Sequence, residues 1–392
     1  MNSIKSLSHD NCCGCMACVS ACSENAITTI IEDGFCFPSI DEDKCIHCGN
    51  CVQACSILNH PQTHKTIKAY IALSKNNEIY EHSSSGGVFG TIADYFIREK
   101  KAVVVGAAIN SNYEVEHIII DDIKELPKIQ GSKYVQSDCS KIFLPIKSEL
   151  MGGKWVLFSG TPCQVAALRC YLGKDYERLI CVDIVCHGVP SPFYFKYHMK
   201  KYYGNGELKS ISFRTKDKYE RYGFNLNVET DRRKYFVSGN IDLYYRMFLS
   251  GLSFRESCYY CPYANENRVG DITIGDCGNS KDYKEFYYDK TISTVYPITE
   301  KGYLLWNEIK KLFNDKEVVL EKEINSNECL IHPTFRPSFR NYLYSGNDYS
   351  AMERKMLGFI GKPKLIIQIK ERVKRIIPEK NREFIKNSLK EI

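Results

Sequence analysis

The spacing of eight cysteines near the start of the chain is the first feature that could do chemistry. The pattern C-x2-C-x2-C-x3-C occurs twice, at Cys12, Cys15, Cys18 and Cys22 and again at Cys45, Cys48, Cys51 and Cys55. A C-x2-C-x2-C segment wraps around an iron–sulfur cube and presents three thiolates to three irons, and the fourth ligand comes from the other run. The spacing therefore predicts two [4Fe–4S] clusters, each held by the first three cysteines of one run and the last cysteine of the other.

Structural zinc is the alternative for these cysteines, because zinc sites also use paired C-x2-C knuckles. Zinc would need only four of the eight cysteines, in two separated pairs. The iron–sulfur interpretation is therefore the stronger one. Cys13 and Cys36 fall outside both runs, and we expect them to be small buried residues.

The composition of the chain indicates its cellular compartment and its number of domains. The chain has 392 residues, of which 44% are hydrophobic and 19 are cysteine. Residues 1–11 are polar and lack the apolar region of a cleavable signal peptide, and no apolar run reaches the roughly 18 residues that a membrane span needs. In a reducing compartment, cysteines are metal ligands or catalytic groups more often than disulfides. We therefore expect a cytoplasmic protein of two or three domains.

After the two cysteine runs, the sequence changes to alternating strands and helices that must position any further chemistry. Strands are predicted at 69–74, 102–108, 115–121, 155–160 and 179–185, and helices at 87–100, 164–171 and 192–203. This alternation indicates an α/β core, to which the strand-rich stretch 208–236 adds antiparallel strands. The predicted fold is an α+β ferredoxin-like domain at 1–60, a polar linker, an α/β domain at 67–345, and a helical tail at 350–392.

Turns at the ends of the predicted strands carry glycines, hydroxyls and ionisable groups. These turns are HSSSGG at 82–87, GSKYVQSD at 131–138, SGTPCQVAALR at 159–169 and VDIVCHGVPS at 182–191. Free backbone N–H groups of a Ser/Gly turn at a helix N-terminus can hold a phosphate, although an ordinary helix cap is the simpler alternative for the first turn. Because ligands of open α/β sheets bind at the carboxyl ends of the strands, several such turns together predict a cofactor crevice.

A third cysteine pattern lies in the predicted core. Cys258 and Cys261 form a C-x2-C knuckle, and Cys163 and Cys186 stand at predicted strand ends. Two cysteines cannot complete a metal site, but these four could together hold a third [4Fe–4S] cluster. A redox-active cysteine pair and buried structural cysteines are the rival interpretations.

Most of the chain resembles known redox proteins. The two runs resemble the two-cluster bacterial ferredoxin, with Ser23 and Ser56 where proline usually follows the fourth cysteine. From about residue 9 to 303, the order of motifs resembles the beta subunit of coenzyme F420 hydrogenase/dehydrogenase. These motifs are S-x-G-G, GSKYVQSD, GTPCQVA-x-L, D-x-x-C-H-G-V-P-S and a C-x2-C followed by GDITIGD. The family usually continues with Phe-Trp-Gly after the last motif, whereas this chain has Cys277, Gly278 and Asn279.

This resemblance implies an FAD in the α/β core that exchanges electrons with the clusters and hydride with a deazaflavin or a related small two-electron substrate. The flavin-facing residues that it implies are Ser85, Gly86, Gly87, Lys133, Tyr134, Gln136, Ser137, Thr161 and His187. Among them, His187 is the expected catalytic residue. A flavin suits this place because clusters pass single electrons and hydride donors deliver two. Exposed clusters are damaged by oxygen, so an anaerobic host is expected.

Three functions are consistent with the sequence. The favoured one is an iron–sulfur flavoprotein oxidoreductase that moves electrons between a ferredoxin-type carrier or a partner redox subunit and coenzyme F420 or another two-electron substrate, and a reductase in a cell-surface polysaccharide pathway is an alternative to it. The second is an electron-transfer subunit with no substrate of its own. The third is a non-redox module with structural clusters, whose α/β core binds a sugar or nucleotide.

The end of the chain is basic. Residues 362–392 contain ten Lys or Arg and four Asp or Glu, and the apolar residues of 365–377 recur at helical spacing. A basic amphipathic helix can lie on an anionic membrane surface, here the inner face of the membrane. Packing on its own domain is the favoured alternative, and no basic-aromatic module for nucleic acid is present.

Overall fold

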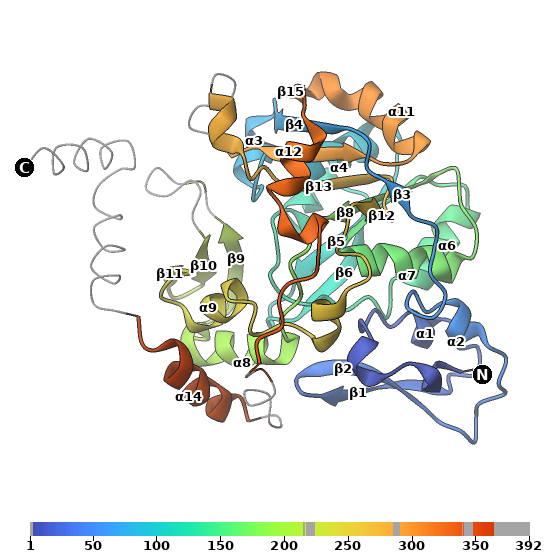
Figure 1. The fold of residues 1–392 in the computed structure, drawn as a ribbon, viewed down its shortest axis with the longest axis vertical. Coiled ribbons are helices and arrows are strands. Elements are labelled where there is room, and N and C mark those ends of the chain that lie inside the picture. The colour runs from blue at the N-terminus through green and yellow to red at the C-terminus, as the bar shows by residue number, and fades with distance from the viewer. Residues whose placement is uncertain are drawn as a thin grey trace, which may run out of the picture.

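The computed structural model describes residues 3–214, 216, 224–284, 291–338, 340 and 348–363. Within these ranges the fold is mixed α/β, built around one large sheet (Figure 1). No helix of the described residues is long and apolar enough to cross a membrane. The basic stretch 365–377 lies outside the described residues, so its predicted helix stays a prediction.

The cysteine-rich segment forms a small unit with short helices and one hairpin. Its elements are α1 (Ala17–Ser20), β1 (Ile27–Glu32), β2 (Phe35–Ile40) and α2 (Asn50–Gln53). The hairpin pairs Glu32 with Phe35 across a two-residue turn. Both turn residues, Asp33 and Gly34, have positive φ, as the tight Asp-Gly turn of a hairpin requires.

The large sheet has eight strands in the order β15-β4-β14-β13-β8-β7-β5-β6. Neighbours β5, β7, β8 and β13 run parallel, and the outer pairs are antiparallel. The strands are β4 (Ala69–Ser74), β5 (Val103–Ile109), β6 (Val115–Ile120), β7 (Val156–Gly160), β8 (Leu179–Ile184), β13 (Ile272–Asp276), β14 (Ser293–Pro297) and β15 (Phe313–Val318). The predicted strand at 69–74 is confirmed, and four more begin and end within one residue of prediction.

Helices cover both faces of this sheet, which is why its central strands are apolar without alternation. One face packs against α4 (Val88–Glu99), α5 (Leu126–Ile129) and α11 (Glu300–Ile309) through residues such as Leu157 and Ile180. The other face packs against α6 (Phe143–Met151) and α7 (Pro162–Leu172) through Val156, Phe158 and Leu179. Cys15, Ala17 and Ala54 belong to this second cluster, so the cysteine-rich unit is packed onto the core.

A second lobe contains a three-stranded antiparallel sheet with an aromatic core. Its elements are α8 (Pro192–Tyr203), β9 (Leu208–Arg214), β10 (Phe224–Thr230), β11 (Lys234–Ser238), α9 (Leu243–Leu249) and α14 (Tyr349–Ile360). Figure 1 shows this sheet beside the large one, with α8 and α14 below it. Two residues of the cysteine-rich hairpin, Phe35 and Phe37, complete the aromatic core of this lobe.

Short elements complete the chain. They are α3 (Asn77–Glu81), α12 (Leu320–Asn325), β3 (His64–Lys65) and β12 (Asn267–Arg268). The predicted linker at 60–65 therefore ends in a strand, because His64 and Lys65 pair with Arg268 and Asn267.

Candidate iron–sulfur and cofactor sites

The two cysteine runs fold into loops with the same backbone. Gly14 and His47 take equivalent positions with φ of 67° and 55°, and Met16 and Gly49 do so with φ of 60° and 81°. In each loop the short helix α1 or α2 follows at once and ends two residues before the fourth cysteine. The repeat that the sequence predicts is thus also a repeat in backbone conformation.

Four of the eight thiols are buried together. Cys12, Cys15, Cys18 and Cys55 are each 9% exposed or less, and none forms a disulfide. Burial raises the pKa of Cys55 to about 11 and also raises that of Cys18, which the charges of Cys12 and Cys55 raise further. Free, buried thiols from both runs in mutual electrostatic contact fit the predicted exchange of the fourth ligand. Among the described residues, no three His, Cys, Asp or Glu are grouped closely enough to hold a single metal ion.

Three of the other four thiols lie nearer to solvent. Cys22 and Cys45 are half-buried and Cys48 is exposed, while Cys51 is buried. The Sγ atom of Cys22 accepts a hydrogen bond from the backbone N–H of Ala26 at 3.3 Å. A group held by this set would be the one that an external partner reaches first.

Two core residues hold the first cysteine loop from behind. The Gln136 side chain donates to the carbonyl of Cys13 at 2.9 Å, and the Arg255 guanidinium donates to the carbonyl of Cys12 at 2.6 Å. Gly14 fits under them because it has no side chain: a Cβ atom there would lie 2.5 Å from Nη1 of Arg255. The structure thus places Gln136 against the cysteine loop.

Thiols from three core segments and the cysteine loop line one cavity of about 220 Å³. The core thiols are those predicted from the sequence: Cys163, Cys186, Cys258 and Cys261. They come from the first turn of α7, the end of β8 and the turn 258–261, and burial raises the pKa of each of the last three to about 12. The structure therefore brings together four cysteines that span nearly a hundred positions of the sequence.

A fifth thiol in this cavity was not singled out by sequence reasoning. Cys13 lines the cavity, and its thiol forms hydrogen bonds with Cys15 on one side and Cys163 on the other. These bonds lower the pKa of Cys13 well below its usual value, whereas the bond to Cys13 raises the pKa of Cys163. The only sequence signal for this role of Cys13 was its position directly after Cys12, because a residue next to a cluster ligand lies in the same loop as that ligand.

His187 also lines the cysteine cavity. Its Nδ1 atom lies 3.1 Å from the Sγ atom of Cys329, and burial lowers the pKa of the imidazole. Thr161 lies one residue before α7, and its hydroxyl lies 3.2 Å from the thiol of Cys163. These two predicted flavin-facing residues therefore stand beside the cysteine set.

The remaining predicted flavin residues form two groups. The first brings the turns 82–87 and 131–138 side by side, because Ser132 donates its backbone N–H to the Ser84 hydroxyl at 2.7 Å. Ser85 donates to the carbonyl of Ile292 at 2.8 Å, and Gly86 leaves no room for a side chain, since its Cβ would lie 2.2 Å from the carbonyl oxygen of Ala72. Gly87 precedes α4 with φ of 85°.

Lys133 and Tyr134 extend this first group toward the small sheet. The Lys133 ammonium donates to the carbonyl of Gln130 at 2.7 Å, and burial lowers its pKa to about 7. The Tyr134 ring stacks on Phe248 with centroids 4.3 Å apart, and its hydroxyl accepts from Arg214 at 3.4 Å. A partly protonated amine and an aromatic wall are groups that an anionic, planar cofactor can use.

Ser137 belongs to the second group, which is a buried network below the first. Its hydroxyl lies 2.9 Å from Nδ1 of His117, and it accepts from the Gln164 side chain at 2.9 Å. His117 also bonds the carbonyl of Ser159 at 3.0 Å, and burial lowers the pKa of its imidazole to about 4. The neutral imidazole therefore connects the ends of β6 and β7 and supports the site from behind.

The segment that departs from the family pattern is also buried. Cys277 is 7% exposed and packs with Tyr80 and Tyr283. Its Sγ atom donates to the Glu323 carboxylate at 3.6 Å, which the Tyr283 hydroxyl meets at 2.6 Å. Cys277 thus ties the end of β13 to α12.

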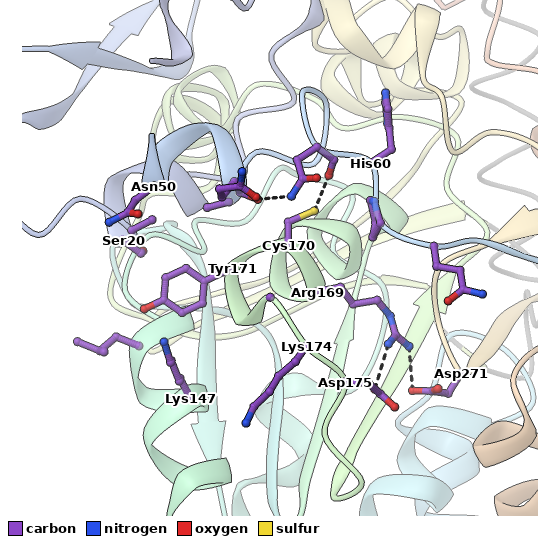
Figure 2. Close-up of a pocket in the computed structure, with 18 of the residues that line it drawn as sticks. Ser20, Asn50, His60, Lys147, Arg169, Cys170, Tyr171, Lys174, Asp175 and Asp271 are labelled. Atoms are coloured by element: carbon purple, nitrogen blue, oxygen red, sulfur yellow. Dashed lines mark hydrogen bonds and ion pairs between the residues drawn. The ribbon is translucent and has the colours of Figure 1, made fainter. Parts of the chain in front are cut away.

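A larger groove of about 1290 Å³ separates the cysteine-rich unit from α6 and α7 (Figure 2). Arg169 lies on its wall between Asp175 and Asp271, at 3.5 and 3.2 Å, and the thiol of Cys170 donates to the carbonyl of Asn59 at 2.7 Å. Cys22 also lines this groove. The groove therefore reaches one member of the more exposed cysteine set.

Comparisons with known proteins agree with the motif order. Residues 69–143 match the N-terminal part, and residues 153–321 the C-terminal part, of the coenzyme F420 hydrogenase/dehydrogenase beta subunit. Residues 38–56 match the 4Fe-4S binding domain. Among solved structures, the F420-reducing [NiFe] hydrogenase complex from Methanosarcina barkeri contains a chain with 16% sequence identity and a TM-score of 0.46, covering 75% of this chain and 90% of its own. A search of curated proteins gave no match.

Proposed function

Because the chain belongs to the coenzyme F420 hydrogenase/dehydrogenase beta-subunit family and carries a 4Fe-4S binding domain, we propose that it is an iron–sulfur flavoprotein oxidoreductase. It takes single electrons from a ferredoxin-type carrier or a partner redox subunit and delivers them in pairs, through FAD, to coenzyme F420 or another small two-electron substrate. The same path could run in reverse. The observation that best supports this proposal is that the thiols form three sets: an outer set with the exposed Cys48, a buried set, and the set that lines the cysteine cavity of the core.

The proposed ligand sets follow this succession. The outer [4Fe–4S] cluster is held by Cys45, Cys48, Cys51 and Cys22, and the inner one by Cys12, Cys15, Cys18 and Cys55. A third [4Fe–4S] cluster is held in the cavity by Cys163, Cys186, Cys258 and Cys261. The hydrogen-bonded thiols of Cys13 and Cys163 support the last assignment, because they bring the inner set and the cavity into contact. The thiols of all three sets must lose their protons to bind iron, so cluster assembly releases protons.

The residues of the first group form the proposed FAD site. Ser85, Gly86 and Gly87 lead into α4, and the N-terminus of a helix attracts an anion. Lys133 adds an amine that is partly charged near neutral pH. When bound, a flavin supplies the exchange between one-electron and two-electron chemistry. His187, which lines the cysteine cavity, is the proposed catalytic residue.

Metal analysis tests the third cluster. After anaerobic reconstitution with iron and sulfide, we expect about twelve irons per chain, and about eight in the Cys258→Ala/Cys261→Ala variant, because each [4Fe–4S] cluster contains four irons. Cys170→Ala is the matched control, since its buried thiol bonds only a carbonyl in the groove, and it should keep the full iron content. Equal iron in all three proteins would show that Cys258 and Cys261 are a redox-active pair or structural residues.

An anaerobic absorbance titration tests the flavin and the substrate. FAD is added to the reconstituted protein, and reduced coenzyme F420 is then added stepwise. Bleaching of both flavin and cluster bands supports the oxidoreductase. If dithionite bleaches the clusters but no FAD is retained, the chain is an electron-transfer subunit without a substrate of its own. If neither reductant acts on the clusters, the redox proposal fails.

A further inference from the structure

One buried arginine lies between the inner cysteine set and the cysteine cavity. The Arg255 side chain is 1% exposed. Its guanidinium donates to the carbonyls of Cys12 and Cys36, at 2.6 and 3.0 Å, and to the side-chain oxygen of Gln136 at 3.3 Å. It also lies over the Phe37 ring, 4.0 Å from the centroid. Every one of these partners is electrically neutral.

Other buried arginines of the core have a carboxylate, and Arg255 does not. Arg268 is 2% exposed and meets Asp183 at 3.1 Å, and Arg340 is 5% exposed and meets Glu256 at 2.8 Å. Among the residues that the structure describes, no Asp or Glu lies within ion-pair distance of the Arg255 guanidinium. A buried cation without a counter-charge is strongly unfavourable, so a negative group must complete this site.

The position of Arg255 shows where that negative group would be. Its guanidinium contacts the backbone at Cys12, and its own carbonyl accepts the backbone N–H of Cys258 at 3.0 Å. Cys12 belongs to the inner set and Cys258 to the cavity set, so the guanidinium contacts the inner set, whereas the cavity set meets the backbone of Arg255. Four thiolates around an oxidised [4Fe–4S] core carry a net charge of about −2, which becomes about −3 when one electron arrives and no bond changes.

We propose that Arg255 is the internal counter-ion of the inner cluster and raises its reduction potential, so that electrons from the outer cluster move inward. The inference rests on the proposed iron–sulfur clusters. In a low-dielectric interior, a fixed positive charge stabilises the more negative, reduced state more than the oxidised one. Net charge and hydrogen bonding near the ligands are recognised controls of cluster potential. Arg255 thus acts as a positioning residue through electrostatics and forms no bond to iron.

The test is an EPR-monitored potentiometric titration of the reconstituted full chain. In Arg255→Gln, we expect the midpoint potential of the inner cluster to fall, while that of the outer cluster changes less and serves as an internal reference. Arg255→Lys keeps the charge and should recover most of the native potential, although it loses the forked hydrogen bonds. Unchanged potentials in Arg255→Gln with full iron content would overturn the proposal, as would equal shifts of both clusters.

A second pair of variants keeps the proposal testable if Arg255→Gln does not fold. Gln136→Glu places a carboxylate beside the guanidinium and should lower the inner potential, whereas Gln136→Met removes the same amide without adding charge and should lower it less. Equal potentials in the two variants would overturn the proposal. Native protein that binds no iron would instead refute the iron–sulfur function itself, so the two failures are distinguishable.

Discussion

Replacing Gly14 by alanine tests how much the contact between the first cysteine loop and the core contributes to stability, apart from the backbone conformation of the loop. Gly14 has φ of 67°, but the equivalent residue of the second loop is His47 with φ of 55°. A side chain is therefore compatible with this backbone. What differs is the surroundings, because a Cβ at Gly14 would lie 2.5 Å from Nη1 of Arg255 and 2.8 Å from Nε2 of Gln136.

Gly49 provides the matched comparison. It has φ of 81°, and a Cβ there would meet nothing within 4 Å. Gly49→Ala should therefore cost only the left-handed backbone, about 1–2 kcal/mol. Gly14→Ala should cost that amount and also displace the hydrogen bonds to Cys12 and Cys13, and a buried polar group left without a partner costs about 1–3 kcal/mol. The expected loss at Gly14 is thus at least twice the loss at Gly49.

Anaerobic scanning calorimetry of the two variants measures this difference as the fall in the unfolding temperature. Iron content should also fall in Gly14→Ala more than in Gly49→Ala, because the displaced loop carries three of the proposed inner ligands. Limited proteolysis in the segment 60–63 gives an independent signal of a loosened contact. Equal losses of stability and iron in the two variants would refute the reasoning, since the strain of the backbone would then explain everything.

Three further predictions concern charge and pH. Burial opposes the charge of His198, but Asp242, at 2.8 Å, and a second buried carboxylate outweigh it and raise its pKa to about 9. The charged imidazole of His198 therefore stabilises the fold fully below about pH 6.5, and this stabilisation is lost as pH rises through 9. Between pH 6 and 10, the melting temperature should fall more steeply for the native chain than for His198→Gln. In urea unfolding, Asp271→Asn should cost about 3–5 kcal/mol, because its fully buried carboxylate meets the mostly buried Arg169. Asp175→Asn, on the exposed side of Arg169, should cost under about 1 kcal/mol. Similar losses in the two variants would contradict this reasoning. Burial lowers the pKa of the Lys133 amine to about 7, so an amine that contacts the proposed FAD should bind it more tightly below pH 7 than above it. A fluorescence titration of FAD binding measures this dependence on pH, and Lys133→Gln should abolish it.

The sequence alone predicted the features that depend on short-range patterns. The two cysteine runs form matching loops because the same ligand spacing dictates the same local backbone path. The strands β4 and β8 and the helix α8 lie where apolar runs and helical periodicity placed them, because those signals come from neighbouring residues. The four core cysteines were grouped because each stood at a predicted strand end or in a knuckle, and the cavity brings them together.

Only the tertiary structure decided which of these residues share a site. Gln136 holds the loop at Cys13, 123 positions away, a contact that no motif predicted. Cys13 was expected to be a small buried residue, but it is half-buried and lies between two thiol sets. Arg255, which no motif marked, reaches Cys12 across 243 positions. Such contacts arise from how the cysteine-rich unit packs on the core, and the burial of a charge is settled by that packing rather than by local spacing.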